Sequence, residues 1–274
     1  MVSSMVTAGA VMGVIGVLFS IGLFYAARAF HVEEDERVEL LTNMLPGANC
    51  GACGFSGCSG LAQALAAGRA QPTQCSVANS EQLAKIAEFL GVEAGPVERQ
   101  VARVMCGGTS AKATQLAGYV GLEDCRAAHL IASGPKGCTY GCLGLGTCVQ
   151  ECPFDAMVLG PDGLPVVDES VCTGCGICVQ VCPRGIMQLV SPEAPLTVRC
   201  VSPMAGKQVR AVCQAGCIAC KICERVCDQD AIHVIDNLAR VNEELCNGCG
   251  ACVEKCPTHC LELTDGQVRV LEAV

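Results

Sequence analysis

Cysteines are the side chains most able to do chemistry in this chain. The segment CTGCGICVQVCP, Cys172 to Pro183, places four of them within eleven residues, separated by two, two and three other residues. The 274-residue chain holds 25 cysteines but only three tyrosines, six phenylalanines and no tryptophan. Disulfide frameworks belong to short secreted chains with scattered cysteines, and an odd total cannot pair completely. The tight runs of thiols therefore predict metal centres rather than disulfides.

The same run occurs again further along the chain. Two later runs have the same spacing, and a looser earlier run has spacings of three, five and three residues. Cys148 and Cys223 are 75 residues apart, and Cys172 and Cys246 are 74 apart, which predicts two tandem units with two runs each. The runs are Cys138, Cys142, Cys148 and Cys152; Cys172, Cys175, Cys178 and Cys182; Cys217, Cys220, Cys223 and Cys227; and Cys246, Cys249, Cys252 and Cys256.

A different four-cysteine pattern precedes these runs. Cys50, Cys53 and Cys58 lie in NCGACGFSGC, and Cys75 follows after 16 intervening residues. The glycines between the thiols allow the backbone to wrap closely around a metal centre. Four thiolates suit zinc or an iron–sulfur cluster, but zinc more often takes two separated C-x2-C pairs. The pattern therefore favours a [4Fe-4S] cluster, with zinc as the alternative.

The C-x2-C-x2-C-x3-C-P run resembles that of the bacterial two-cluster ferredoxins. In that family the fourth cysteine of each run ligates the cluster of the other run. The resemblance implies four [4Fe-4S] ligand sets in the two units: Cys138, Cys142, Cys148 and Cys182; Cys172, Cys175, Cys178 and Cys152; Cys217, Cys220, Cys223 and Cys256; and Cys246, Cys249, Cys252 and Cys227. With the module at Cys50, five clusters are expected.

Five cysteines remain outside these sets. Cys106 and Cys125 precede the first ferredoxin-like unit, and Cys200 and Cys213 follow it, so both segments could meet on one side of that unit. We hypothesise that these four hold a sixth cluster. The alternative is that they are small buried hydrophobic residues. Cys260 has no assigned role.

The N-terminal segment predicts the position of the chain in the cell. No charged side chain occurs before Arg28, and the apolar stretch exceeds the roughly 20 residues that a membrane-spanning helix needs. A secretory signal peptide, the alternative, would carry a positive start. Because the first basic residue follows the span, the rest of the chain is expected on the cytoplasmic side of a prokaryotic inner membrane.

Two helices are predicted after the span, over 31–44 and over 80–90, the second beginning at an N-cap Ser80 and ending at Gly91. The expected class is α+β: one transmembrane helix, a small loop-and-helix cluster module and two tandem ferredoxin-like units. The predicted boundaries are 1–30 for the anchor, 31–92 for the module, 93–134 for a connecting segment, and 135–195 and 196–274 for the two units.

Several functions are disfavoured. The net charge of −9, without a basic stripe, argues against nucleic acid as a partner. No G-x-G-x-x-G or P-loop sequence offers an NAD or ATP site, and the four histidines form no catalytic arrangement, so no catalytic residue is predicted. Five basic residues beside the cysteine runs could form a docking face for an acidic soluble ferredoxin, or could simply be solvated: Lys136, Arg184, Lys221, Arg225 and Lys255.

The order of these parts resembles the B subunits of the Rnf complex over essentially the whole chain. The specific features are the uncharged N-terminal helix and the NCGACGFSGC stretch, and the second ferredoxin-like unit would make this a long form. The resemblance implies a membrane-bound, ion-translocating ferredoxin:NAD oxidoreductase. In it this subunit would take electrons from reduced ferredoxin and pass them to membrane subunits, while a separate flavin subunit handles NAD. The alternative is a polyferredoxin adaptor that serves a different reductase and pumps no ions.

Overall fold

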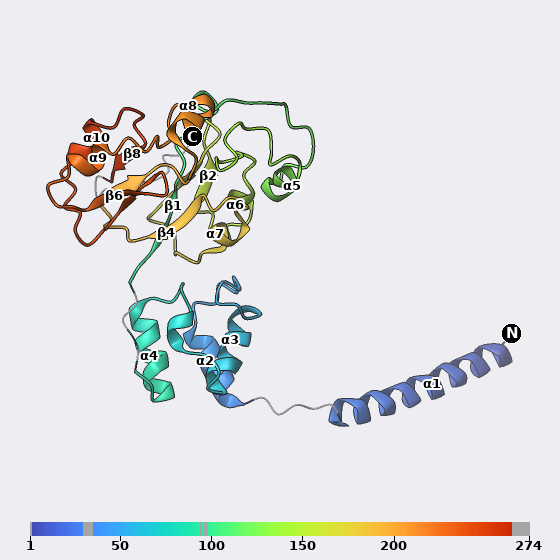
Figure 1. Cartoon of the computed structure of the whole chain (residues 1–274). Coiled ribbons are helices and arrows are strands. Elements are labelled where there is room, and N and C mark those ends of the chain that lie inside the picture. Colours follow the sequence, from blue (N-terminus) through green and yellow to red (C-terminus); the bar gives the residue numbers. More distant parts are fainter. Residues whose placement is uncertain (1, 30–34, 94, 96–97, 265–274) are drawn as a thin grey trace.

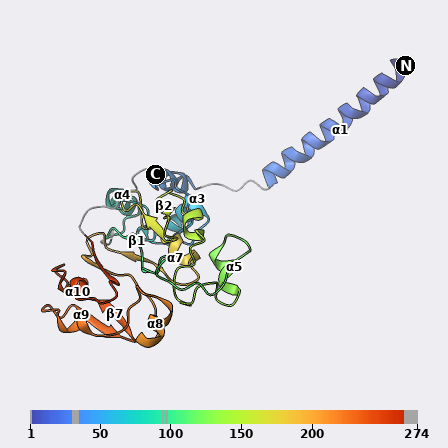
Figure 2. The same cartoon turned by 90° about the horizontal axis from the view of Figure 1, so that it is seen from above.

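The computed structural model describes residues 2–29, 35–93, 95 and 98–264 (Figure 1). Helix α1, Val2–Ala29, lies apart from the remainder in both views (Figure 2). Among the described residues one helix is long and apolar enough to cross a membrane, the stretch Gly9–Ala29 of α1. Met12 is 75% exposed and Phe19 70% exposed, as expected for side chains that face lipid. The start of the predicted 31–44 helix lies outside the described residues.

Three α-helices and one short 3-10 turn build the module that follows α1. They are α2 (Glu36–Met44), α3 (Gly57–Ala66), η1 (Pro72–Gln74) and α4 (Ser80–Leu90). Leu41, Leu61 and Ile86 are fully buried between them. Helix α4 covers the predicted residues, but its N-cap lies one residue earlier than predicted, because Asn79 and not Ser80 caps the helix and forms a capping box with Gln82. Gly91 ends the helix in the left-handed conformation, as predicted.

The first ferredoxin-like unit consists of two two-stranded sheets and two short helices. Strands β2 (Met157–Leu159) and β3 (Pro165–Val167) pair antiparallel, and β1 (Val101–Val104) pairs antiparallel with β4 (Met187–Val190). Helices α6 (Thr147–Gln150) and α7 (Ile177–Val181) each contain the third cysteine of a run. Strand β1 belongs to residues 93–134, which were predicted only to connect the module to the first unit. Part of this segment is therefore a component of the first unit. Its helix α5 spans Cys125–Leu130.

The second unit repeats the same plan. Strand β5 (Leu196–Val198) pairs with β8 (Leu261–Leu263), and β6 (Ile232–Ile235) pairs with β7 (Leu238–Val241). Helices α9 (Ile222–Arg225) and α10 (Ala251–Glu254) each contain the third cysteine of a run, and α8 (Gly206–Val212) precedes them. In both units a strand before the first run pairs with a strand after the second run, so each unit is closed by its own chain ends.

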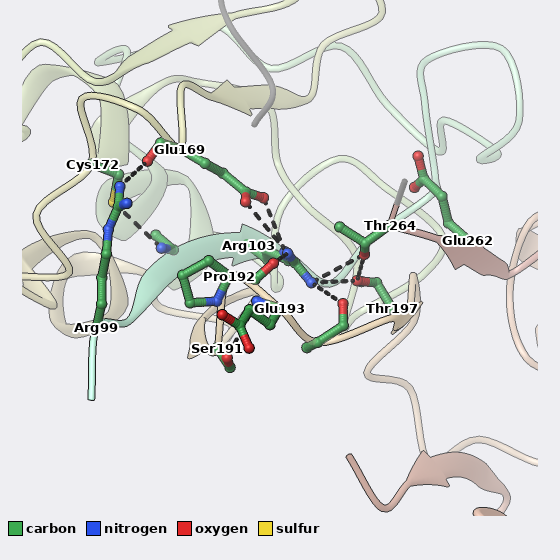
Figure 3. A network of polar contacts seen from close by, with 12 residues as sticks. Arg99, Arg103, Glu169, Cys172, Ser191, Pro192, Glu193, Thr197, Glu262 and Thr264 are labelled. Atoms are coloured by element: carbon green, nitrogen blue, oxygen red, sulfur yellow. Dashed lines mark hydrogen bonds and ion pairs between the residues drawn. The ribbon is translucent and has the colours of Figure 1, made fainter. Parts of the chain in front are cut away.

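A buried arginine joins the two units (Figure 3). Arg103 on β1 is 7% exposed, and its guanidinium contacts the carboxylate of Glu169 at 3.0 Å. It also donates to the carbonyl oxygens of Pro192 and Ala194 and to the hydroxyl of Thr264, which follows β8. The guanidinium therefore ties the first unit to the linker and to the last strand of the second.

Candidate metal centres

All four cysteine runs share one backbone conformation. A residue with positive φ stands four positions before the third cysteine of each run, and another stands two positions before it, where it caps the short helix. These pairs are Gly144 and Gly146, Gly174 and Gly176, Ala219 and Lys221, and Gly248 and Gly250. A left-handed residue in each position turns the loop around the space between the thiols.

In each unit, the first three cysteines of the second run lie near the fourth cysteine of the first run, as predicted. Burial raises the pKa of Cys178 to about 12, and the thiols that raise it further are Cys175, Cys172 and Cys152. In the second unit a cavity between α10, β6 and β8 is lined by Cys227, Cys246, Cys249 and Cys252. The structure thus brings together both of these predicted ligand sets, each with the fourth cysteine of the other run.

The first run of the second unit gathers its predicted set and one further thiol. Burial raises the pKa of Cys223 to about 11, and Cys217 and Cys220 add to this. The sulfurs of Cys256 and Cys260 lie 3.7 Å apart. Hydrogen bonding from the Cys260 thiol lowers the pKa of Cys256 to about 4 and that of Cys217 to about 6. Cys260, which the sequence left without a role, therefore contacts two predicted ligands.

The module brings Cys53, Cys58 and Cys75 together at the ends of α3 and η1. Burial raises the pKa of Cys75, opposed by the backbone N–H groups of Val77 and Ala78, and the thiols of Cys53 and Cys58 lie near enough to raise it further. The backbone N–H of Cys58 donates to the side chain of Asn49 at 2.9 Å. A Cβ at Gly57 would lie 2.8 Å from that amide oxygen, so only glycine fits here.

The first run of the first unit differs from its predicted set in one member. A cavity between α6 and the end of α7 is lined by Cys142, Cys148 and Cys182, and its fourth thiol belongs to Cys125. Burial raises the pKa of Cys148 to about 12, and Cys142, Cys125 and Cys182 raise it further. The structure does not bring Cys138 to this cavity. Cys138 instead lines a second cavity together with Cys106, Cys200 and Cys213.

The thiol sets differ from single-ion sites in size. In the described part of the chain, no three His, Cys, Asp or Glu side chains converge closely enough for one metal ion. A zinc ion, with Zn–S bonds of about 2.3 Å, would require sulfurs about 3.8 Å apart. A [4Fe-4S] cluster suits a wider all-thiolate set, because its own iron and sulfide atoms lie between the ligands.

Backbone N–H groups point at several of the sulfurs. Ile186 donates to Cys182 and Ala231 donates to Cys227, each over 3.4 Å. These donors lie four residues after the fourth cysteine of their runs, so the two units provide the same contact. Hydrogen bonds of this kind stabilise negative charge on cluster sulfurs and raise the reduction potential.

Neighbouring thiol sets lie near one another. Cys50 of the module is close enough to raise the pKa of Cys175, and Cys178 is close enough to raise the pKa of Cys148. In the second unit Cys252 likewise raises the pKa of Cys223. The module is therefore adjacent to the first unit, and the two sites within each unit are adjacent to each other.

The five predicted docking residues separate into two groups. Lys136 is only 4% exposed, so it cannot belong to a docking face. Arg184 is half-buried and donates to the carbonyl oxygens of Ser133, Cys138 and Gly141, which makes it part of the loop framework. The remaining three are exposed on or beside α9 and α10: Lys221, Arg225 and Lys255.

The fold and the sites together define a class. An apolar N-terminal helix carries a cluster module and two ferredoxin-like units, which is the arrangement of a membrane-anchored iron–sulfur electron carrier. A family model described as a putative Fe-S cluster matches residues 45–77, and the 4Fe-4S binding domain matches residues 165–188 and 239–262.

Similar proteins identify the family within this class. The chain is 45% identical to the B subunit of the Na(+)-translocating ferredoxin:NAD(+) oxidoreductase complex of Acetobacterium woodii, over 92% of this chain and 75% of that protein. It is 41% identical to the B subunit of the ion-translocating oxidoreductase complex of Methanosarcina acetivorans, over 96% of this chain and all of that protein. It is also 41% identical to the B subunit of the proton-translocating ferredoxin:NAD(+) oxidoreductase complex of Clostridium ljungdahlii, over 90% of this chain and 88% of that protein. The chain belongs to the family of Rnf complex B subunits, electron-transfer subunits of ion-translocating oxidoreductases.

Proposed function

We propose that this subunit accepts electrons from a reduced soluble ferredoxin and relays them to the membrane subunits of its complex. Family membership and the cysteine sites support an electron-transfer role, and the related proteins named above include ferredoxin:NAD(+) oxidoreductase subunits. Bound [4Fe-4S] clusters supply one-electron transfer at each site. Reduction of NAD is assigned to a separate flavin subunit, because no sequence pattern for NAD binding occurs in this chain.

The ligands of these clusters are proposed from the thiols that lie together. Four sets are those expected from the sequence: Cys50, Cys53, Cys58 and Cys75; Cys152, Cys172, Cys175 and Cys178; Cys217, Cys220, Cys223 and Cys256; and Cys227, Cys246, Cys249 and Cys252. In the first of these sets, Cys50 is assigned from the sequence pattern and the other three from their proximity. A fifth includes Cys142, Cys148 and Cys182. The chain itself thus provides thiolate ligands and hydrogen-bond donors to them.

The ferredoxin is proposed to dock on the packed helices α9 and α10 of the second unit. Of the 25 cysteines, all of which the structure describes, only Cys220 and Cys249 are exposed, and both lie at this end of the molecule. The exposed Arg225 and Lys255 lie beside them, and Lys221 pairs at 3.8 Å with Glu224. Basic side chains around exposed cluster ligands would attract an acidic carrier to the point where clusters come closest to solvent.

The module and α1 are proposed to face the membrane partners. Cys50 lies near Cys175 of the first unit, which supports a position of the module at the end of the series opposite to α9 and α10. Arg28 ends the apolar helix, so the positive-inside rule favours a cytoplasmic location for the cluster-bearing part, at the inner membrane of a prokaryote. Electrons received from ferredoxin would then leave next to the membrane.

Stopped-flow reduction of the anaerobically purified full chain by a reduced bacterial two-cluster ferredoxin tests this proposal. We expect the second-order rate constant to fall steeply with ionic strength. Reversing the three exposed charges (Lys221→Glu, Arg225→Glu, Lys255→Glu) should slow reduction by about tenfold at low salt. A matched triple reversal at exposed sites elsewhere, Arg69→Glu, Lys207→Glu and Arg210→Glu, should have a much smaller effect.

Equal slowing by both triple variants would mean that only net charge matters and would reject this docking face. A chain that ferredoxin does not reduce at all, although dithionite reduces it, would reject ferredoxin as the donor.

A further inference from the structure

The register of the first cysteine run shows that it lacks a cysteine. Counting back from Cys152 with the spacing of the other three runs places Cys142, Leu145 and Cys148 at the three loop positions. Gly144 and Gly146 have the same positive φ as Gly174 and Gly176, which flank Cys175 of the second run. Leu145 therefore stands where a middle ligand belongs, and Cys138 lies outside the run.

Cys125 lies where it can replace the missing thiol. Its backbone N–H donates to the buried hydroxyl of Thr147 at 2.6 Å, directly beside Cys148. The side chain of Asp124 caps α5 by accepting from the backbone N–H groups of Arg126 and Ala127, and Arg126 bridges to Glu151 at 3.1 Å. Helix α5 is thus attached to α6, and the thiol of Cys125 lines the same cavity as Cys142, Cys148 and Cys182.

Cys138 is held at the second cavity by backbone hydrogen bonds. Gly137 donates to the carbonyl oxygen of Thr114, and Thr114 donates to that of Val212, each over 2.9 Å. This ladder places Cys138 beside Cys213, which ends helix α8. The sulfurs of Cys106 and Cys213 both lie 3.5 Å from the position that a Cβ would take at Gly108, so a glycine there leaves room between the thiols.

The remaining ligand and a buried cation complete this second site. Burial raises the pKa of Cys200 to about 11, and Cys106 is among the neighbouring thiols that add to this. The ammonium group of Lys136, which is 4% exposed, donates to the carbonyl oxygen of Gly108 at 3.0 Å. Its positive charge acts to lower the pKa of Cys213. A buried ammonium group is costly without a negative partner. A cluster with four thiolate ligands would supply that negative charge.

We infer that Cys106, Cys138, Cys200 and Cys213 hold a sixth [4Fe-4S] cluster between the two ferredoxin-like units, and that Cys125 replaces Cys138 as a ligand of the neighbouring cluster. The inference rests on the proposed cluster ligation but goes beyond it in the number of sites and in the ligands. The backbone N–H of Cys142 donates to the sulfur of Cys106 at 3.4 Å, and Cys200 lies next to Cys217. The sixth site therefore connects the series of sites in the first unit with that in the second.

Iron and acid-labile sulfide in anaerobically prepared full-length variants test this assignment. The unsubstituted chain should hold about 24 irons, and the C106A/C213A variant should lose about four of them. Adding Cys138→Ala to that variant should remove no more iron, because this residue belongs to the same cluster. Adding Cys125→Ala instead should remove about four more irons. Cys260→Ala is the matched cysteine control and should leave the iron content unchanged.

The opposite pattern would overturn the exchange of ligands. In that pattern, adding Cys138→Ala to C106A/C213A removes further iron and adding Cys125→Ala removes none. About 20 irons in the unsubstituted chain, unchanged in C106A/C213A, would overturn the sixth site while leaving the electron-carrier function intact. If C106A/C213A does not fold, C138A/C200A should give the same loss of about four irons. Zinc in place of iron would instead reject the proposed function itself.

Discussion

At the scale of single residues, the thiols differ in what surrounds them. Cys260 is 3% exposed and its sulfur lies 3.7 Å from that of Cys256, so it is placed to donate to a ligand rather than to bind iron. A hydrogen bond to a ligand sulfur stabilises the more negative, reduced cluster. Its effect should therefore appear in the reduction potential and not in the metal content.

Replacing Cys260 with alanine should accordingly lower the reduction potential of one cluster while all iron remains bound. A redox titration followed by electron paramagnetic resonance measures this shift, with parallel iron analysis. Loss of about four irons would contradict this role and make Cys260 a ligand. The Cys256→Ala variant provides the comparison, because it should disturb the cluster itself.

The Arg103–Glu169 pair is the second residue-scale case. Both side chains are nearly inaccessible, and removing one member of a buried pair leaves an uncompensated charge, at a cost of about 3–5 kcal/mol. Arg103→Ala should lower the resistance of the whole chain to chemical denaturation under anaerobic conditions, followed by the loss of cluster absorbance. Arg210→Ala, at an exposed position on α8, should have little effect. Equal behaviour of the two variants would show that the pair does not hold the units together.

At the scale of elements, each short helix within a cysteine run begins after a loop that has positive φ at the same two positions. The first run keeps those glycines but has Leu145 where the others have a cysteine, and α5 approaches from outside the run to bring Cys125. A ferredoxin run and a separate helix thus build one site together.

A rescue experiment tests this relation. Cys125→Ala should remove or convert the cluster of the first run, and adding Leu145→Cys should restore it, because the run then has the ferredoxin spacing. Iron content and the electron paramagnetic resonance spectrum of the reduced double variant report the outcome. If Leu145→Cys restores no cluster in this background, Leu145 does not occupy a ligand position.

The sequence predicted this level of structure unevenly. Spacing predicted the runs and the four-cysteine module, because their cysteines are close in sequence or follow the repeat. The resemblance to two-cluster ferredoxins predicted the crossed fourth cysteines. The partners of Cys125 and Cys138 depend on contacts between segments far apart in the chain, which spacing does not encode; for example, Cys125 contacts Thr147. The one available signal was the register of the first run, read from Cys152 backwards. Strand β1 was missed for the same reason, since its partner β4 is far along the chain.

At the scale of the whole molecule, helix α1 packs independently of the module and the two ferredoxin-like units. The side chains of α1 from Gly9 onward are mostly exposed, and the module and the two units have cores of their own. The cluster sites therefore do not depend on the membrane helix for their ligands or for their packing.

Deleting residues 1–30 should yield a chain that no longer fractionates with membranes but keeps its full iron content. Expression in a host without other subunits of the complex avoids retention by partners. A loss of iron in the truncated chain would contradict the independence of the two parts. Persistent membrane association would show that a surface outside α1 also binds lipid.

The most direct test of the central claim, a continuous series of six [4Fe-4S] sites, is the Mössbauer spectrum and iron content of the full chain prepared anaerobically with ⁵⁷Fe. The account predicts about 24 irons per chain, all in [4Fe-4S] clusters, with an equal amount of sulfide. About 20 irons would contradict the six-site series and leave the two ferredoxin-like units without a connecting cluster. Iron outside such clusters, or zinc in its place, would contradict the account of this chain as an electron carrier.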